Sequence, residues 1–257
     1  MYRTPRRTVS LLARMFPTLV CHSKAITHIV QLSSAAKSPR YSRKDLIRQS
    51  LGVMRALESV GVSVEISGID HVRTVDWPCV FASNHMSAFE TLVLPGIIAP
   101  FGEVTFVVKE SLIRYPVFRH IMHAMNSIPV GRENPRDDLR AVLTGGKGRL
   151  GAGVSIVLFP ESVRVAEFDP KRFNTIATKL ARDADVPVIP LALKTDAWGV
   201  GSLVSDFGKV DLSKKVHFAF GAPLRVKDRG TEEHREVVAF IAGKLREWGS
   251  KGSPHHS

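Results

Sequence analysis

Short apolar runs alternate with helical patterns along most of this chain, and this alternation limits its possible folds more than any other feature. Runs of strand length occupy residues 62–66, 79–82, 104–108, 128–130, 154–159, 186–193 and 216–220. Segments with helical spacing cover residues 87–98, 116–125, 137–150, 173–183 and 232–248. Strands that alternate with helices form a mainly parallel sheet with helices on both faces. The sequence therefore predicts an α/β fold.

A basic segment precedes this alternating region. Residues 1–48 hold ten Lys and Arg against one acid, Asp45, so they carry +9 of the net charge of +12. Apolar residues between 9 and 30 recur every three or four positions, which predicts one broken or two short amphipathic helices, parted near Pro17 or Cys21. Helices of this kind lie in a bilayer interface or pack on a domain as ordinary helices, and both alternatives stay open. An acid-poor, Arg- and Ser-rich start is also typical of organelle transit peptides.

These patterns divide the chain into three predicted parts. Residues 1–41 form a membrane-docking segment that includes a linker at 34–39, residues 42–250 form the main domain, and residues 251–257 form a disordered tail. Ser42 is placed to cap the first helix of the domain, with Asp45 in its first turn. No run reaches the roughly 18 consecutive apolar residues that a membrane-spanning helix needs.

Ligands of open α/β sheets bind at the carboxyl ends of the strands, so the polar residues that follow the apolar runs are the candidates for a site. Asn84 and His85 follow the second run, and Glu90 comes five residues after His85, in the first turns of the next helix. A carboxylate on one imidazole nitrogen fixes the tautomer and leaves the other nitrogen free to take a proton. The alternative is a capping or core histidine beside a surface glutamate.

Further charged residues follow three other strands. Lys109 and Arg132 each stand at a strand end, and Glu161, Ser162 and Arg164 follow the run at 154–159. Lysine and arginine side chains at such ends are able to hold a phosphate group. The alternatives are solvated surface cations for the first two and a structural ion pair for Glu161 and Arg164.

Taken together, these segments resemble the glycerophospholipid acyltransferase family, whose best-known members are the 1-acylglycerol-3-phosphate (lysophosphatidate) acyltransferases. The family pattern Asn-His-x4-Asp corresponds to Asn84-His85-x4-Glu90. A Lys-bearing strand, an Arg-bearing strand end, Phe-Pro-Glu-Gly-Thr-Arg and Val-Ile-Pro-Leu follow in the family's order, as 108–112, 128–132, 159–164 and 188–191. The resemblance spans roughly residues 60–225. Each motif alone is weak, but five of them in order are fairly specific.

The resemblance implies transfer of a fatty acyl group from acyl-CoA or acyl-carrier protein to the hydroxyl of a lysophospholipid. It implies that His85 is the general base and Glu90 its orienting carboxylate. The acceptor-binding residues that it implies are Asn84, Lys109, Arg132, Glu161, Ser162 and Arg164. The implied location is peripheral, on the cytoplasmic face of a membrane.

Two departures from the family pattern keep other functions open. Glu90 replaces the usual Asp, and Ser162-Val163 replaces Gly-Thr. Val163 offers neither the close backbone approach of Gly nor the hydroxyl of Thr. The acceptor could therefore be something other than lysophosphatidate, including a non-phospholipid. A catalytically silent relative that binds lipid or acyl-CoA is the alternative from another functional class.

Metal, cofactor and nucleic-acid functions are not favoured. His120 and His123 lack an evident third metal ligand, and Cys21 and Cys79 form no zinc spacing and no disulfide framework. The expectation is therefore no metal and no cofactor beyond the acyl donor. Nucleic-acid binding would rest on net charge alone, because the tryptophans do not alternate with basic residues.

Overall fold

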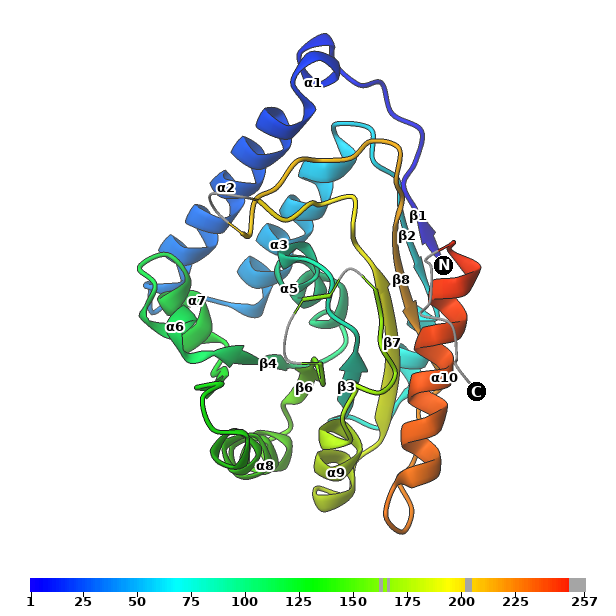
Figure 1. Cartoon of the computed structure of the whole chain (residues 1–257). Coiled ribbons are helices and arrows are strands. Elements are labelled where there is room, and N and C mark those ends of the chain that lie inside the picture. The colour runs from blue at the N-terminus through cyan, green and yellow to red at the C-terminus, as the bar shows by residue number, and fades with distance from the viewer. Residues whose placement is uncertain (162–163, 166, 202–204, 250–257) are drawn as a thin grey trace.

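The computed structural model describes residues 1–161, 164–165, 167–201 and 205–249. Its strands form one eight-stranded sheet in the order β1-β2-β8-β7-β3-β6-β4-β5 (Figure 1). Neighbouring strands run parallel except at β1–β2 and β7–β8. The predicted mainly parallel α/β sheet is thereby confirmed. The strands are β1 (Tyr2–Arg3), β2 (Val64–Ser67), β3 (Val80–Ser83), β4 (Val104–Lys109), β5 (Ile128–Val130), β6 (Ser155–Leu158), β7 (Val188–Lys194) and β8 (Val216–Phe220).

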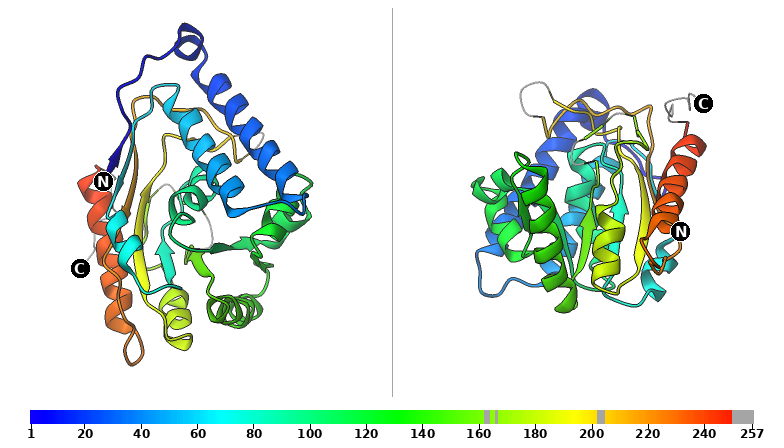
Figure 2. Two further views of the ribbon diagram at one scale, coloured as in Figure 1. Left: turned by 180° about the vertical axis from the view of Figure 1, so that it is seen from behind. Right: turned by 60° about the horizontal axis from the view of Figure 1, so that its bottom comes forward.

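Helices cover both faces of this sheet, as the two views in Figure 2 show. One core cluster joins the sheet to α1–α5 and α7, and a second joins the opposite face to α8–α10. The helices are α1 (Leu11–Met15), α2 (Pro17–Ala36), α3 (Arg43–Glu58), α4 (Ile69–Thr74), α5 (Ala88–Ile98), α6 (Glu110–Arg114), α7 (Phe118–Ala124), α8 (Pro135–Gly151), α9 (Ile176–Asp183) and α10 (Thr231–Glu247).

The central strand β3 is buried on both faces. Phe81 belongs to the cluster on the α5 side, and Val80 and Ala82 belong to the cluster on the α9 side. Successive side chains of a strand point to opposite faces, so a strand between two cores reads as a continuous apolar run. The residues that directly follow such a strand are held in place by the helices on both faces. His85 occupies this kind of position after β3.

The N-terminal helices share a core with the rest of the domain. The predicted break near Pro17 is present, and Pro17 is the first residue of α2, where its missing N–H costs no helical hydrogen bond. One face of α2, which includes Cys21, Ala25 and Ile29, is buried in the same cluster as α3. The division at residue 41 stays a prediction, and this cluster contains side chains from both sides of it.

Three details differ from the predicted elements. Helix α2 extends to Ala36, so residues 34–36 are helical where a linker was predicted; alanine is the strongest helix former. The helix predicted over 116–125 begins only at Phe118, because Pro116 separates it from the unpredicted helix α6. Strand β1 and helix α4 were not predicted either.

Within the described residues, no helix combines the length and the apolar character that crossing a bilayer requires.

Candidate active site

Three adjacent parallel strands deliver polar residues to one edge of the sheet. Strand β3 lies between β6 and β7 and is parallel to both, so their carboxyl ends meet. His85 lies two residues past β3, Thr195 directly follows β7, and Glu161 lies three residues past β6. This edge is where open α/β sheets bind their ligands.

The start of helix α5 explains how Glu90 reaches His85. Ser87 is the N-cap residue and Glu90 is the third residue of the helix, and together they form a capping box. In a capping box, the acidic side chain turns back toward the N-cap backbone and satisfies N–H groups that the helix leaves free. The carboxylate therefore lies at the helix start, next to the turn that carries His85, although its Cα lies further along the helix.

Glu90 is fully buried and accepts hydrogen bonds at both oxygens. Oε1 lies 2.9 Å from His85 Nδ1, 2.6 Å from the Met86 amide nitrogen and 2.8 Å from that of Ser87. Oε2 lies 2.6 Å from the hydroxyls of both Ser87 and Thr195. Burial alone would raise the pKa of Glu90, but the hydrogen bond and charge of His85 and the two hydroxyls outweigh it and lower that pKa. The site therefore holds Glu90 as a carboxylate.

Both the ring and the backbone of His85 are held in place. Nδ1 contacts Glu90, and the ring stacks on Phe159 with 4.3 Å between centroids and 22° between planes. The His85 carbonyl accepts from the Val165 amide at 2.9 Å, and the His85 amide donates to Glu161 Oε2 at 3.4 Å. Nε2 has no hydrogen-bond partner among the described residues. Because Glu90 holds the proton on Nδ1, Nε2 is the nitrogen that is free to accept one.

Glu161 is buried beside this histidine, with only 6% of its surface exposed. Burial raises its pKa to about 7, although the hydrogen bond from the His85 backbone acts in the opposite direction. Its Oε1 is buried without a partner in the described part of the chain. Glu161 is therefore able to take up a proton near neutral pH and to donate as well as accept a hydrogen bond.

The predicted cations have different surroundings. Arg164 forms an ion pair with Asp206, with 2.6 Å between Nη1 and Oδ1. Arg132 adopts a left-handed backbone conformation with φ of 66°, and Asp138 accepts from its amide. Partial desolvation and then the charge of Arg164 lower the pKa of Arg132, so the two cations act on each other electrostatically. Lys109 is exposed at the end of β4.

Asn84 and Ser162 were also predicted to bind the acceptor. The Asn84 side-chain amide bridges β3 to β7, because its Nδ2 donates to the Leu193 carbonyl and its Oδ1 accepts from the Leu193 amide, both at 2.8 Å. Asn84 is almost fully buried. Both ends of its amide are thus used by the sheet, and substrate contact by Asn84 stays a prediction. Ser162 lies outside the described residues.

Sequence reasoning missed several residues that build this site. Ser87 was detectable, because Ser87 and Glu90 have the spacing of a capping box. Thr195 directly follows a strand and so meets the criterion that found His85. Phe159 and Asp206 gave no signal, since an aromatic ring after a strand and an acid in a loop are both common.

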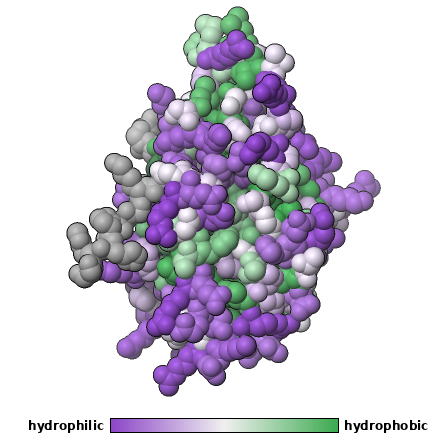
Figure 3. Space-filling view, turned by 90° about the vertical axis from the view of Figure 1, so that its right-hand side faces the viewer, coloured by the Kyte–Doolittle hydropathy of each residue, from purple (hydrophilic) through white to green (hydrophobic). Residues whose placement is uncertain are grey.

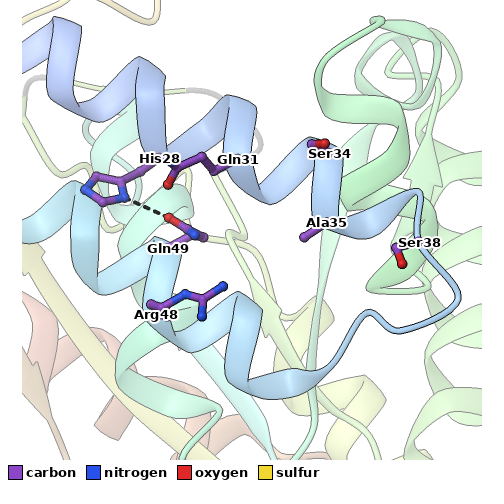
Figure 4. A pocket seen from close by; sticks show the side chains of 7 residues that line it. All are labelled: His28, Gln31, Ser34, Ala35, Ser38, Arg48 and Gln49. Carbon is purple, nitrogen blue, oxygen red and sulfur yellow. Dashed lines mark hydrogen bonds between the residues drawn. The ribbon is translucent and has the colours of Figure 1, made fainter.

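A separate hollow of about 640 Å³ lies between α2 and α3. Figure 4 shows that His28 and Gln49 face each other across the two helices, joined by a hydrogen bond of 2.7 Å. None of the residues that line this hollow belongs to the His85 site.

Comparisons with known proteins show which family this chain resembles. Residues 63–194 match the protein family described as Acyltransferase. The chain is 30% identical over 132 residues to the 1-acyl-sn-glycerol-3-phosphate acyltransferase of Pseudomonas aeruginosa, which is 51% of this chain and 49% of that protein. It is 28% identical over 129 residues to the chloroplastic 1-acyl-sn-glycerol-3-phosphate acyltransferase BAT2 of Brassica napus, which is 50% of this chain and 36% of that protein. The chain thus spans half the length of these relatives or less.

A solved structure shares the fold. The crystal structure of the 1-acyl-sn-glycerophosphate (LPA) acyltransferase PlsC from Thermotoga maritima superposes with a TM-score of 0.70 at 19% sequence identity. The superposition covers 95% of this chain and 99% of that one. The family match covers all strands from β2 to β7, including those that carry His85, Glu161 and Thr195. The chain therefore belongs to the acyltransferase family.

Proposed function

We propose that this protein transfers a fatty acyl group from acyl-CoA or acyl-carrier protein to the hydroxyl of a lysophospholipid of the lysophosphatidate type. The observation that carries this proposal is the contact of 2.9 Å between His85 Nδ1 and the buried Glu90 carboxylate. The names of the relatives support the same reaction, since they are 1-acyl-sn-glycerol-3-phosphate acyltransferases.

In the proposed reaction, His85 Nε2 removes the proton from the acceptor hydroxyl as its oxygen attacks the thioester carbonyl. The tetrahedral intermediate then collapses, the carbon–sulfur bond breaks, and the thiolate leaves and takes the proton back from His85. The products are an ester and a free thiol. Glu90 stabilises the imidazolium that exists between the two proton transfers, which is the usual role of a carboxylate behind a catalytic histidine.

The cations near His85 support a phosphate-bearing acceptor. The backbone hydrogen bond between Val165 and His85 holds the backbone that carries Arg164 next to His85, and Arg132 is close enough to Arg164 for their charges to interact. Two guanidinium groups suit a phosphate, because each presents several N–H donors in a planar fork.

The N-terminal helices support docking on the cytoplasmic face of a membrane. Apolar side chains on α1, on α2 and between them are left exposed, with Leu11 73%, Leu19 69% and Phe16 51% accessible. Figure 3 shows hydrophobic residues gathered at the tip of the molecule that α1 forms in Figure 1. Exposed apolar side chains on a basic segment match an interfacial helix, and each Lys or Arg near an anionic surface adds about 1 kcal/mol.

Purified protein with acyl-CoA and a panel of lysolipids provides the test, with release of free thiol as the measurement. The wild type is expected to turn over lysophosphatidate, and His85→Ala is expected to lower the rate by about a hundred- to ten-thousand-fold. His123→Ala, which replaces an exposed histidine on α7, is the control and is expected to keep the wild-type rate.

Other results would point to the alternatives. Acceptor or acyl-CoA binding without thiol release would indicate a catalytically silent relative. Thiol release that requires a non-phospholipid alcohol would change the acceptor class and leave the mechanism in place. Full activity in folded His85→Ala would refute the role of the base.

A further inference from the structure

Asp206 contacts the guanidinium group that the proposed function assigns to phosphate binding. Its Oδ1 lies 2.6 Å from Arg164 Nη1, and the two side chains are 28% and 27% exposed. A guanidinium group has five N–H donors. One contact with a carboxylate therefore leaves most of the fork of Arg164 free for another anion.

The segment that carries Asp206 is firmly held. The Asp206 carbonyl accepts a hydrogen bond of 2.7 Å from Nε1 of Trp198, which is only 1% exposed. The next ring, Phe207, packs against Trp198 with 5.8 Å between centroids. The Gly208 amide donates to the Gly199 carbonyl at 3.0 Å. Asp206 thus reaches Arg164 from a backbone that is fixed at its own carbonyl and at the two residues that follow it.

Helix α2 supplies part of that fixation. His22 Nε2 lies 2.7 Å from the Gly208 carbonyl, and the His22 ring packs edge-on against Trp198 with 4.5 Å between centroids. The Val210 amide donates to the Thr18 hydroxyl oxygen at 3.1 Å. A continuous series of contacts therefore connects α2, the helix proposed to dock on lipid, with Arg164.

We propose that Asp206 is a positioning residue that holds the Arg164 guanidinium ready for the phosphate of the acceptor, and that α2 fixes the segment 205–210 behind it. This inference rests on the proposed function. An unrestrained arginine loses conformational freedom when it binds an anion, whereas one already held by a fixed carboxylate has lost it beforehand.

Steady-state kinetics of Asp206→Asn test the proposal, with lysophosphatidate and acyl-CoA varied separately. The KM for lysophosphatidate is expected to rise about three- to tenfold, which is the worth of ordering one side chain on binding. The kcat and the KM for acyl-CoA are expected to stay within about twofold of wild type, because Arg164 does not hold the donor in this scheme. Asp206→Glu is expected to restore most of the loss, since it returns the carboxylate.

The matched control is Asp76→Asn, which removes a carboxylate from another Arg–Asp pair, at 2.8 Å from Arg225. It is expected to behave as wild type. A double variant adds a further check: Asp206→Asn is expected to have no added effect once Arg164 is replaced by alanine, because its action passes through that side chain.

Three results would overturn the inference: an unchanged or lower KM for lysophosphatidate, a parallel rise in both KM values, or additive effects with Arg164→Ala. A wild type that releases no thiol would instead refute the proposed function. In that case the affinity for lysophosphatidate is measured by calorimetric titration. Weaker binding by Asp206→Asn than by the wild type supports the positioning role. Equal binding by the two proteins, or no binding by the wild type, rejects it.

Discussion

Replacing Glu90 by glutamine separates the charge of this residue from its capping role. The amide oxygen of Gln occupies the place of Oε1 and still accepts from His85 and from the amides of Met86 and Ser87. The amide NH₂ group then faces the hydroxyls of Ser87 and Thr195, which are able to rotate and accept. The start of α5 is therefore expected to stay folded, while the negative charge behind the imidazole is lost.

The distance sets the size of the effect. A carboxylate 2.9 Å from an imidazolium nitrogen attracts it by about 6 kcal/mol in an effective dielectric of about 20. The amide dipole keeps part of this attraction. If half is lost, the barrier rises by about 3 kcal/mol and kcat falls about a hundredfold, and a complete loss would correspond to about ten-thousand-fold. The expected reduction in kcat lies between these limits.

Thiol release from acyl-CoA under saturating lysophosphatidate measures kcat, and circular dichroism verifies that the variant is folded. Asp45→Asn is the matched control, because Asp45 forms a second capping box with Ser42 at the start of α3, far along the chain from the site. It is expected to keep wild-type activity. If folded Glu90→Gln turned over within threefold of the wild type, the carboxylate would not assist His85 and the reasoning would be refuted.

Three further outcomes are expected. Leu19→Glu should weaken binding to anionic vesicles about tenfold or more in a sedimentation assay, while Leu212→Glu, another exposed leucine, should not. Thr195→Val should lower kcat about tenfold without changing the KM for the acceptor, because one hydrogen bond to the Glu90 carboxylate is lost. Glu161 has a pKa of about 7 in the folded protein and an ordinary value of 4.5, so the native state binds its proton more tightly than the unfolded chain. The free energy of unfolding of the wild type should therefore decrease by up to about 3 kcal/mol as the pH rises from about 4.5 to 7. Glu161→Gln should lack this decrease when urea unfolding at pH 5 is compared with urea unfolding at pH 8.

The sheet was predictable because its central strands lie between two cores. Such strands read as unbroken apolar runs, and β3 and β7 were placed within two residues of their observed ends. Strand β1 has only two residues and pairs at the edge, so it carries no periodic signal. Helix α6 was missed for a similar reason, because it has only five residues and none of them is buried.

Only those contacts of the site that join residues close in sequence were predictable. His85 and Glu90 are five positions apart, so a turn followed by a helix brings them together. Thr195 lies 105 positions from Glu90, and their contact depends on β7 lying next to β3 in the sheet. A single sequence does not give that strand order. The same limit hid Asp206, whose partner Arg164 follows a different strand.

The shared use of the Glu90 carboxylate by the helix cap and by the histidine has an evolutionary consequence. Glutamine keeps the cap and loses only the charge, but a substitution that removes the acceptor oxygens disturbs folding and the proposed chemistry together, so natural selection acts on both through one position. Aspartate is one nucleotide change away, yet its shorter side chain draws the carboxylate back from the donors that surround it. A lineage that exchanges the two acids is therefore expected to carry accompanying changes at Ser87 or Thr195.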